Sequence, residues 1–160
     1  MSTLQLAVQM ELDGEKYYQK QADHFADQPI SKVFRILAKA EYKHAALIKS
    51  FAAGEDISMA DDNSEDLKHV FSDLAPYKPD VTSIPRQLDV YRFAMEIEQK
   101  SIDLYQRLKD KSEDKIEGKL LDFLVQQEKT HYALFENLTE MVQRPEDWVE
   151  DAEFGNRDEY

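Results

Sequence analysis

The amino-acid sequence predicts an all-α protein, a four-helix bundle made of two repeated helical hairpins joined by a long crossover that contains a short helix. Three observations predict this fold. Apolar residues recur three, four and seven positions apart over most of the chain, and no segment alternates apolar and polar residues as a strand would. Residues 4–51 also align without a gap with residues 91–138, so the second hairpin repeats the first.

The first predicted hairpin contains two helices. Apolar residues recur at helical spacing over residues 3–26, and Asp27-Gln28-Pro29 then interrupts the pattern. Ser31 is the expected N-cap of the second helix, because a serine side chain can accept a hydrogen bond from the first backbone N–H groups. This helix is expected to end at about residue 53, before Gly54.

The second hairpin is predicted to contain helices at about residues 84–111 and 114–143. The last helix should end before Pro145, since proline has no backbone N–H to donate. Residues 54–87 form the crossover between the hairpins. It begins with a polar, acidic stretch and contains three prolines, and its segment DLKHVFSDL can form one short helix.

The chain is therefore divided into a bundle at residues 1–145 and a strongly acidic C-terminal tail at residues 146–160. The tail has weak periodicity. We expect it to be irregular or to dock on the bundle through Trp148 and Phe154.

Composition excludes several classes of function. The net charge of -13 disfavours binding to nucleic acid and to anionic membrane surfaces, and suits a protein that attracts cations. The absence of cysteine excludes disulfides and cysteine-ligated metal centres. No segment has the roughly 18 consecutive apolar residues of a membrane span, and the N-terminal residues do not resemble a secretion signal. We expect a cytoplasmic protein with no nucleic-acid or membrane partner.

The repeat also matches polar residues that lie on apolar helix faces. The segment EYKH at residues 41–44 aligns with EKTH at 128–131, and Glu11 aligns with Glu98. Two amphipathic hairpins would align to some extent by periodicity alone, but that alternative does not explain why buried polar positions are repeated as well as apolar ones. Other identical pairs are Ala7/Ala94, Tyr18/Tyr105, Gln19/Gln106, Asp23/Asp110, Lys32/Lys119, Leu37/Leu124, Ala46/Ala133 and Leu47/Leu134.

These repeated polar residues predict a dinuclear metal site. A glutamate and a histidine three positions apart lie about 60° apart around a helix, so both can face one centre. Four buried carboxylates cannot remain ionised side by side without cations. Two divalent ions would neutralise them, and oxygen and imidazole ligands suit iron or manganese and also accept zinc. The predicted ligands are Glu11, Glu41, His44, Glu98, Glu128 and His131.

A single Glu-x-x-His pattern is weak evidence, because it also arises by chance. Asp66-x-x-His69 in the crossover is similar and has no counterpart in the repeat, so we interpret it as surface, as we do the isolated His24. Glu15 is a possible extra carboxylate, although a solvated position is the simpler interpretation, and Glu96 is expected to be exposed. Residues interpreted as packing are Leu6, Met10, Phe34, Leu37, Phe93, Leu121, Leu124, Leu134 and Phe135.

Tyr18 and Tyr105 are the candidate catalytic residues. Each follows a stripe glutamate by seven positions on nearly the same helix face. Their hydroxyl groups could hydrogen-bond the metal-binding carboxylates across the bundle and orient them, or hold a bound ligand. The alternative is that both tyrosines are simply large core residues.

The pattern resembles the rubrerythrin branch of the ferritin-like di-iron carboxylate proteins. The resemblance covers about residues 1–143 and implies a ferritin-like bundle, two iron ions in its core and a homodimer. It also implies that ferrous iron reacts with hydrogen peroxide or dioxygen, in oxidative-stress defence or iron handling. The segments that carry it are Glu11-Leu-Asp-Gly14 with Tyr18, Glu41-x-x-His44, Glu98 with Tyr105, and Glu128-x-x-His131.

Two departures from the family pattern qualify this expectation. Rubrerythrins proper carry a rubredoxin domain with four cysteines, whereas this chain has none and would need an external electron donor, such as a rubredoxin-type protein. Rubrerythrins also have an additional carboxylate where this chain has Ser101, which aligns with Gly14 in the first repeat. The function expected is a peroxidase or ferroxidase. The alternatives are an iron-storage protein and a structural metal site holding zinc.

Overall fold

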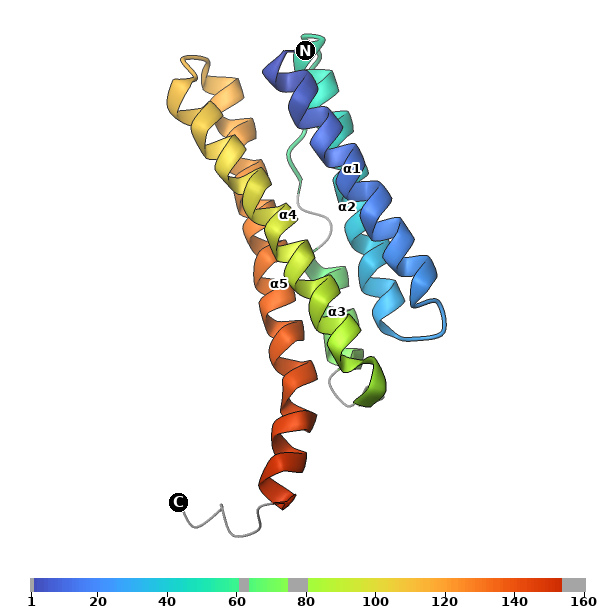
Figure 1. The fold of residues 1–160 in the computed structure, drawn as a ribbon. Helices are drawn as coiled ribbons and strands as arrows, with labels where there is room; N and C mark the ends of the chain where they lie inside the picture. The colour runs from blue at the N-terminus through green and yellow to red at the C-terminus, as the bar shows by residue number, and fades with distance from the viewer. Residues whose placement is uncertain (1, 61–63, 75–80, 154–160) are drawn as a thin grey trace.

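The computed structural model describes residues 2–60, 64–74 and 81–153 of the chain, and the side chains of residues 2–60, 65–70, 72–74 and 82–143. These residues form helices, and no strand is present among them (Figure 1). The elements are α1 (Thr3–His24), α2 (Ile30–Ala52), α3 (Ser64–Leu74), the short 3-10 helix η1 (Val81–Ser83), α4 (Ile84–Lys111) and α5 (Lys115–Glu153).

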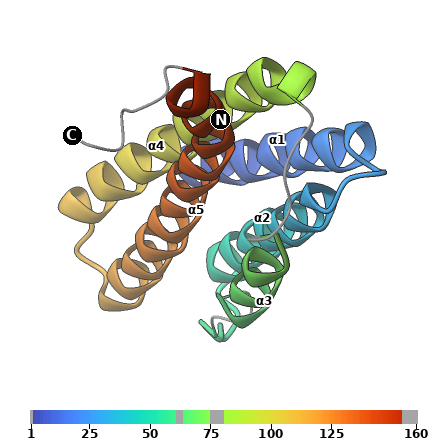
Figure 2. The ribbon, with the colours of Figure 1, turned by 90° about the horizontal axis from the view of Figure 1, so that it is seen from below.

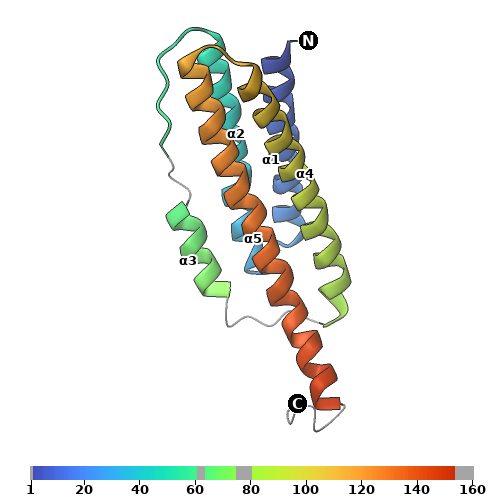
Figure 3. The same cartoon turned by 90° about the vertical axis from the view of Figure 1, so that its left-hand side faces the viewer.

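The four long helices pack as two antiparallel hairpins, α1 with α2 and α4 with α5. The hairpins meet where α1 contacts α4 and α2 contacts α5. Residues 55–60 leave the end of α2 and run along the outside of the bundle (Figure 3). The crossover helix α3 lies beside α2 (Figure 2). The prediction of an all-α bundle with a short helix in the crossover is confirmed.

Two helices begin with a side-chain cap, and a third lacks the cap that was predicted for it. Ser2 and Gln5 form a reciprocal capping box at the start of α1. Asp114 accepts hydrogen bonds from two backbone N–H groups at the start of α5. The prediction that Ser31 caps α2 is wrong. Pro29 already has helical angles, φ -56° and ψ -30°, and no side chain caps the helix. Proline's fixed φ suits the first turn of a helix, so winding begins before Ser31.

The predicted end of the last helix before Pro145 is also wrong, because α5 continues to Glu153. A proline deprives only one preceding carbonyl of its partner, and the residues after it can wind normally. Figure 1 shows this end of α5 projecting beyond the other helices. Residues 146–153 are thus helical rather than irregular. Phe154 lies outside the described residues, and the side chain of Trp148 lies outside the described side chains.

Two apolar clusters close the bundle above and below its middle. One contains stacked aromatic rings, with the Tyr18 and Phe34 centroids 6.2 Å apart and those of Tyr18 and Phe135 5.9 Å apart. The other contains Ile48, Leu120, Leu121 and Leu124 among its buried members. Each cluster removes apolar surface from water, which is the main term that stabilises the fold. The polar residues of the next section lie between these two clusters.

Leu6 and Phe93 are not core residues, contrary to the prediction. Leu6 is 43% exposed and Phe93 is 50% exposed. The two are equivalent in the repeat, and each precedes an inward-facing glutamate by five positions, which is roughly 140° around a helix. Periodicity therefore places both on the outside. None of the helices that the structure describes combines the length and the apolar character that crossing a membrane requires.

Candidate metal centre

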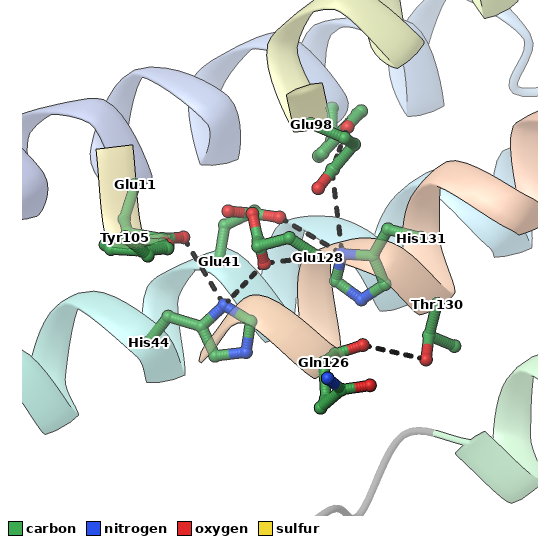
Figure 4. Close-up of polar contacts among 10 residues, drawn as sticks. Glu11, Glu41, His44, Glu98, Tyr105, Gln126, Glu128, Thr130 and His131 are labelled. Carbon is green, nitrogen blue, oxygen red and sulfur yellow. Dashed lines mark hydrogen bonds and ion pairs between the residues drawn. The ribbon is translucent and has the colours of Figure 1, made fainter. Parts of the chain in front are cut away.

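All six predicted ligand residues meet in the middle of the bundle (Figure 4). Glu11 comes from α1 and Glu98 from α4, one glutamate from each of the two facing helices. α2 supplies Glu41 and His44, and α5 supplies Glu128 and His131. Every one of these residues is 3% exposed or less.

The first half of the centre surrounds His44. Its Nδ1 atom lies 3.1 Å from Glu128 Oε1 and 3.4 Å from Glu11 Oε2. Glu41 completes this group, in which each residue offers one atom and these atoms lie within 4.8 Å of one another.

The second half surrounds His131. Its Nδ1 atom lies 3.3 Å from Glu41 Oε1, 3.6 Å from Glu98 Oε1 and 3.8 Å from Glu128 Oε1. Glu41 and Glu128 belong to both groups, whereas Glu11 and Glu98 each belong to one. His44 aligns with His131 in the sequence repeat, and Glu11 aligns with Glu98. The two halves of the centre are therefore built from equivalent residues of the two hairpins.

The carboxylate oxygens and imidazole nitrogens of the centre lie close together, but most of them form no hydrogen bond with one another. Among the described residues, His44 Nδ1 and His131 Nδ1 lie near carboxylate oxygens without a hydrogen bond to any protein group. The same is true of both oxygens of Glu128 and of one oxygen each of Glu11, Glu41 and Glu98. Leaving so many buried polar atoms unpaired would cost several kcal/mol in total. Nitrogen and oxygen lone pairs that converge in this way are what a divalent cation requires.

The sequence matches the rubrerythrin protein family over residues 2–139. The chain belongs to the rubrerythrin family. No curated protein and no solved structure is a significant match to it. Membership of the rubrerythrin family, with the structure described above, confirms the ferritin-like all-α fold and indicates a metal-binding protein.

Two tyrosines hold the outer carboxylates of this rubrerythrin-family centre. Tyr18 on α1 donates a hydrogen bond of 2.5 Å to Glu98 Oε1 on α4. Tyr105 on α4 donates one of 2.5 Å to Glu11 Oε1 on α1. Both tyrosines are fully buried, so each hydroxyl fixes one oxygen of a glutamate. In Glu11 the other oxygen, Oε2, lies toward His44. In Glu98, by contrast, the oxygen that accepts from Tyr18 is also the one that lies 3.6 Å from His131 Nδ1.

The charges of the centre set its protonation. Burial and the neighbouring carboxylates Glu11, Glu128 and Glu98 raise the pKa of Glu41 well above its ordinary 4.5. Burial, Glu11 and Glu98 do the same to the pKa of Glu128. Burial lowers the pKa of His44, but the Glu11 charge outweighs it and the pKa of His44 lies well above 6.5. Burial raises the pKa of Glu11, but the His44 charge and the hydrogen bond from Tyr105 outweigh it and hold that pKa below 4.5.

A pH dependence of stability follows for the metal-free protein. A carboxyl or imidazole whose pKa is raised on folding stabilises the fold below its unfolded pKa and loses that contribution as the pH rises. Glu41, Glu128 and His44 all have raised pKa values. The contribution of Glu11, with a lowered pKa, is lost only on acidification below 4.5. We therefore expect the free energy of unfolding of the metal-free protein to fall as the pH rises above the ordinary glutamate pKa of 4.5.

Urea unfolding of the metal-free protein at a series of pH values measures this dependence, and Glu41→Gln should flatten it. Metal-loaded protein should show the opposite slope, because protons compete with the metal for the same atoms. Stability that rises with pH in the metal-free protein would contradict the assigned pKa directions.

The tyrosine hydrogen bonds predict a measurable loss of stability. Tyr18→Phe removes the donor to Glu98, and a hydrogen bond to a charged group is worth about 1.5–3 kcal/mol. Each kcal/mol lowers the Tm of a chain of this size by about 2–4 °C. Tyr17→Phe is the matched control, because the neighbouring hydroxyl makes a longer bond of 3.4 Å to the Val90 carbonyl. Equal Tm values for the two variants would show that the Tyr18 hydrogen bond contributes nothing.

The remaining predicted residues lie away from the centre. His24, His69 and Glu96 are exposed, as expected, and Glu15 is half-buried on α1 outside both groups of converging atoms. A Cβ atom added at Gly14 would lie 3.5 Å from Glu41 Oε2, an ordinary contact, so this glycine leaves room beside Glu41.

Sequence reasoning missed two residues that lie next to His44. The ring of Phe123 contacts the His44 ring at 6.4 Å between centroids, and Gln127 is buried one turn further along α5. Gln127 aligns with Ala40 in the repeat, so no repeated polar position marked it. Only the packing of α5 against α2 places both residues beside the centre.

Proposed function

We propose that this chain binds two iron ions through Glu11, Glu41, His44, Glu98, Glu128 and His131 and reduces hydrogen peroxide, with dioxygen as a second oxidant. The observation that supports this most directly is the convergence of unpaired carboxylate and imidazole atoms in two equivalent groups. Manganese and zinc would also fit the ligand types. The net charge of -13 favours the approach of cations.

Each side chain has a separate task in the proposed reaction. Glu41 and Glu128 are shared by both halves and would help to hold both ions, while Glu11 and Glu98 would each help to hold one. When bound, the two ferrous ions supply one electron each, so that hydrogen peroxide takes up two electrons and two protons, its O–O bond breaks and two water molecules form. An external reductant, which we propose to be a rubredoxin-type protein, then returns the electrons.

The tyrosines would keep the Glu11 and Glu98 carboxylates in position while the charge of the centre changes. Burial and the Glu98 charge raise the pKa of Tyr18 well above 10.0, and burial and the Glu11 charge do so for Tyr105. Both phenols therefore remain protonated and continue to donate to the carboxylates. We propose that the same O–H groups can turn toward a bound peroxide. The apolar clusters at both ends exclude bulk water from this step.

Anaerobic loading with Fe²⁺ followed by hydrogen peroxide tests the proposal. We expect rapid oxidation of two ferrous ions per peroxide, followed in absorbance, and repeated turnover when reduced rubredoxin is added. His131→Ala should abolish the fast phase. His69→Ala is the matched control, because that histidine is exposed on α3.

The other outcomes would each favour a different function. Slow oxidation with many irons retained would favour storage, and bound metal without any redox change would favour a structural zinc site. The homodimer that the resemblance implies stays a prediction, which sedimentation of the loaded protein can test.

A further inference from the structure

The two histidine helices have equivalent outer faces, and the crossover covers both of them. On α2, this face includes Lys43, Ala46, Leu47 and Ser50, which line a cavity of about 370 Å³. The residues of α5 that line a second cavity, of about 580 Å³, are Thr130, Ala133, Leu134 and Asn137. These are the repeat equivalents of the four α2 residues, in the same order.

The crossover covers the two faces differently. Over α2 it is a non-helical segment, from which Asp56, Ile57, Ser58 and Ala60 line the first cavity. On the α5 side it is the helix α3, which packs on α2 and contributes Leu67, Lys68 and Ser72 to the second cavity. Leu67 is itself buried there.

Because of this difference, only one half of the centre adjoins one of these two cavities. His44 lines the first cavity, together with Gln127 and Phe123 of α5. His131, its equivalent, does not line the second. Figure 4 shows the ring of His44 with one nitrogen toward the carboxylates and the other pointing away from them. The imidazole of His44 therefore separates the first cavity from the carboxylates.

A divalent ion needs a polar path to reach a buried centre. Its transfer through apolar side chains is prohibitive, because isolated charges lose their hydration there. The two apolar clusters close the bundle on either side of the centre. The first cavity has Lys43 and apolar residues in its lining, but it also offers the Asp56 carboxylate, the Ser50 and Ser58 hydroxyls and the Gln127 amide, and it reaches the imidazole of His44.

We infer that the cavity beside His44 is the port through which metal ions enter and leave the centre, with the His44 ring as its inner gate. The inference rests on the proposed metal site and adds the side of the bundle from which ions reach it. Ions exchange on the His44 side, and the half around His131 fills and empties through it. The face under α3 is closed to ions.

The repeat supplies a matched pair of variants for the test. Ala46 and Ala133 each follow a ligand histidine by two positions, both are exposed, and each lines one of the two cavities. Ala46→Trp fills the proposed port, and Ala133→Trp places the same bulk under α3. Ser58→Trp narrows the port from the crossover side and guards against a local effect on α2.

The measurement is the rate of anaerobic Fe²⁺ uptake by the metal-free protein and of Fe²⁺ loss to the chelator ferrozine. We expect Ala46→Trp and Ser58→Trp to slow both rates by about tenfold or more at an unchanged stoichiometry of two ions, and Ala133→Trp to change them by less than about twofold. Circular dichroism and Tm verify that each variant is folded.

The outcomes separate this inference from the proposed function. Wild-type protein that takes up no Fe²⁺ would overturn the metal site and the port together. Wild-type protein that binds two ions, with Ala46→Trp and Ala133→Trp exchanging them equally fast, would overturn only the port. Equal slowing by both variants would also overturn it, since that result points to general opening of the bundle.

Discussion

An excess of Fe²⁺ over the two sites, added without oxygen, is expected to raise the Tm of the metal-free protein by about 10 °C. Binding to the folded state alone contributes about 4 kcal/mol when the free ion is at 1,000 times its Kd. In this chain the ions would also remove the mutual repulsion of four buried carboxylates, which raises the pKa of both Glu41 and Glu128 in the metal-free state.

Calorimetry of the metal-free and loaded protein measures this shift. Mg²⁺ is the control cation, because it keeps its water ligands and prefers an all-oxygen octahedral site. Mg²⁺ should leave the Tm within about 2 °C of the metal-free value. A shift of that size corresponds to a change in stability of roughly half a kcal/mol to one kcal/mol. A similar rise with both cations would mean that Fe²⁺ acts through the acidic surface rather than through the buried imidazoles.

Replacing a shared carboxylate is expected to remove both metal ions, whereas replacing an outer one should remove one. Glu128 lies 3.1 Å from His44 Nδ1 and 3.8 Å from His131 Nδ1, so it serves both halves. Glu98 lies near His131 only. We expect Glu128→Gln to weaken both sites by more than the roughly 10–100-fold that loss of an outer-shell partner costs. Glu98→Gln should leave one ion bound, in the half around His44.

Titration calorimetry and metal analysis after desalting measure the stoichiometry of each variant. Glu96→Gln is the matched control, since this glutamate lies two positions from Glu98 and is exposed. It should bind two ions like the wild type. If Glu128→Gln retained one ion while Glu98→Gln lost both, the assignment of shared and outer carboxylates would be reversed.

The centre was predictable because its evidence is local and duplicated. A glutamate and a histidine one turn apart on an apolar face are weak evidence once, but Glu41 with His44 recurs as Glu128 with His131. Helical periodicity then decides which way each side chain points, and a bundle has only one interior. The tyrosines followed from the same periodicity, although their crossed pairing, Tyr18 with α4 and Tyr105 with α1, depends on how the hairpins pack.

The errors of prediction arose where the preference of a single residue was overridden by the structure of the neighbouring residues. Ser31 is a good capping residue, but the turn before it was already helical. Pro145 removes one hydrogen bond, yet α5 continues because later residues wind normally. The port beside His44 could not be predicted, because it depends on where the crossover packs. Nothing in the sequence of residues 56–60 indicates that this segment packs over the outer face of α2.

The most direct test of the two-metal centre is anomalous X-ray diffraction from crystals loaded anaerobically with Fe²⁺, measured on both sides of the iron absorption edge. We expect two peaks between the helices, about 3.5–4 Å apart as in other dinuclear sites. One should lie against His44 and the other against His131, with Glu41 and Glu128 between them. No peak in the bundle, or peaks only at exposed carboxylates, would contradict the account.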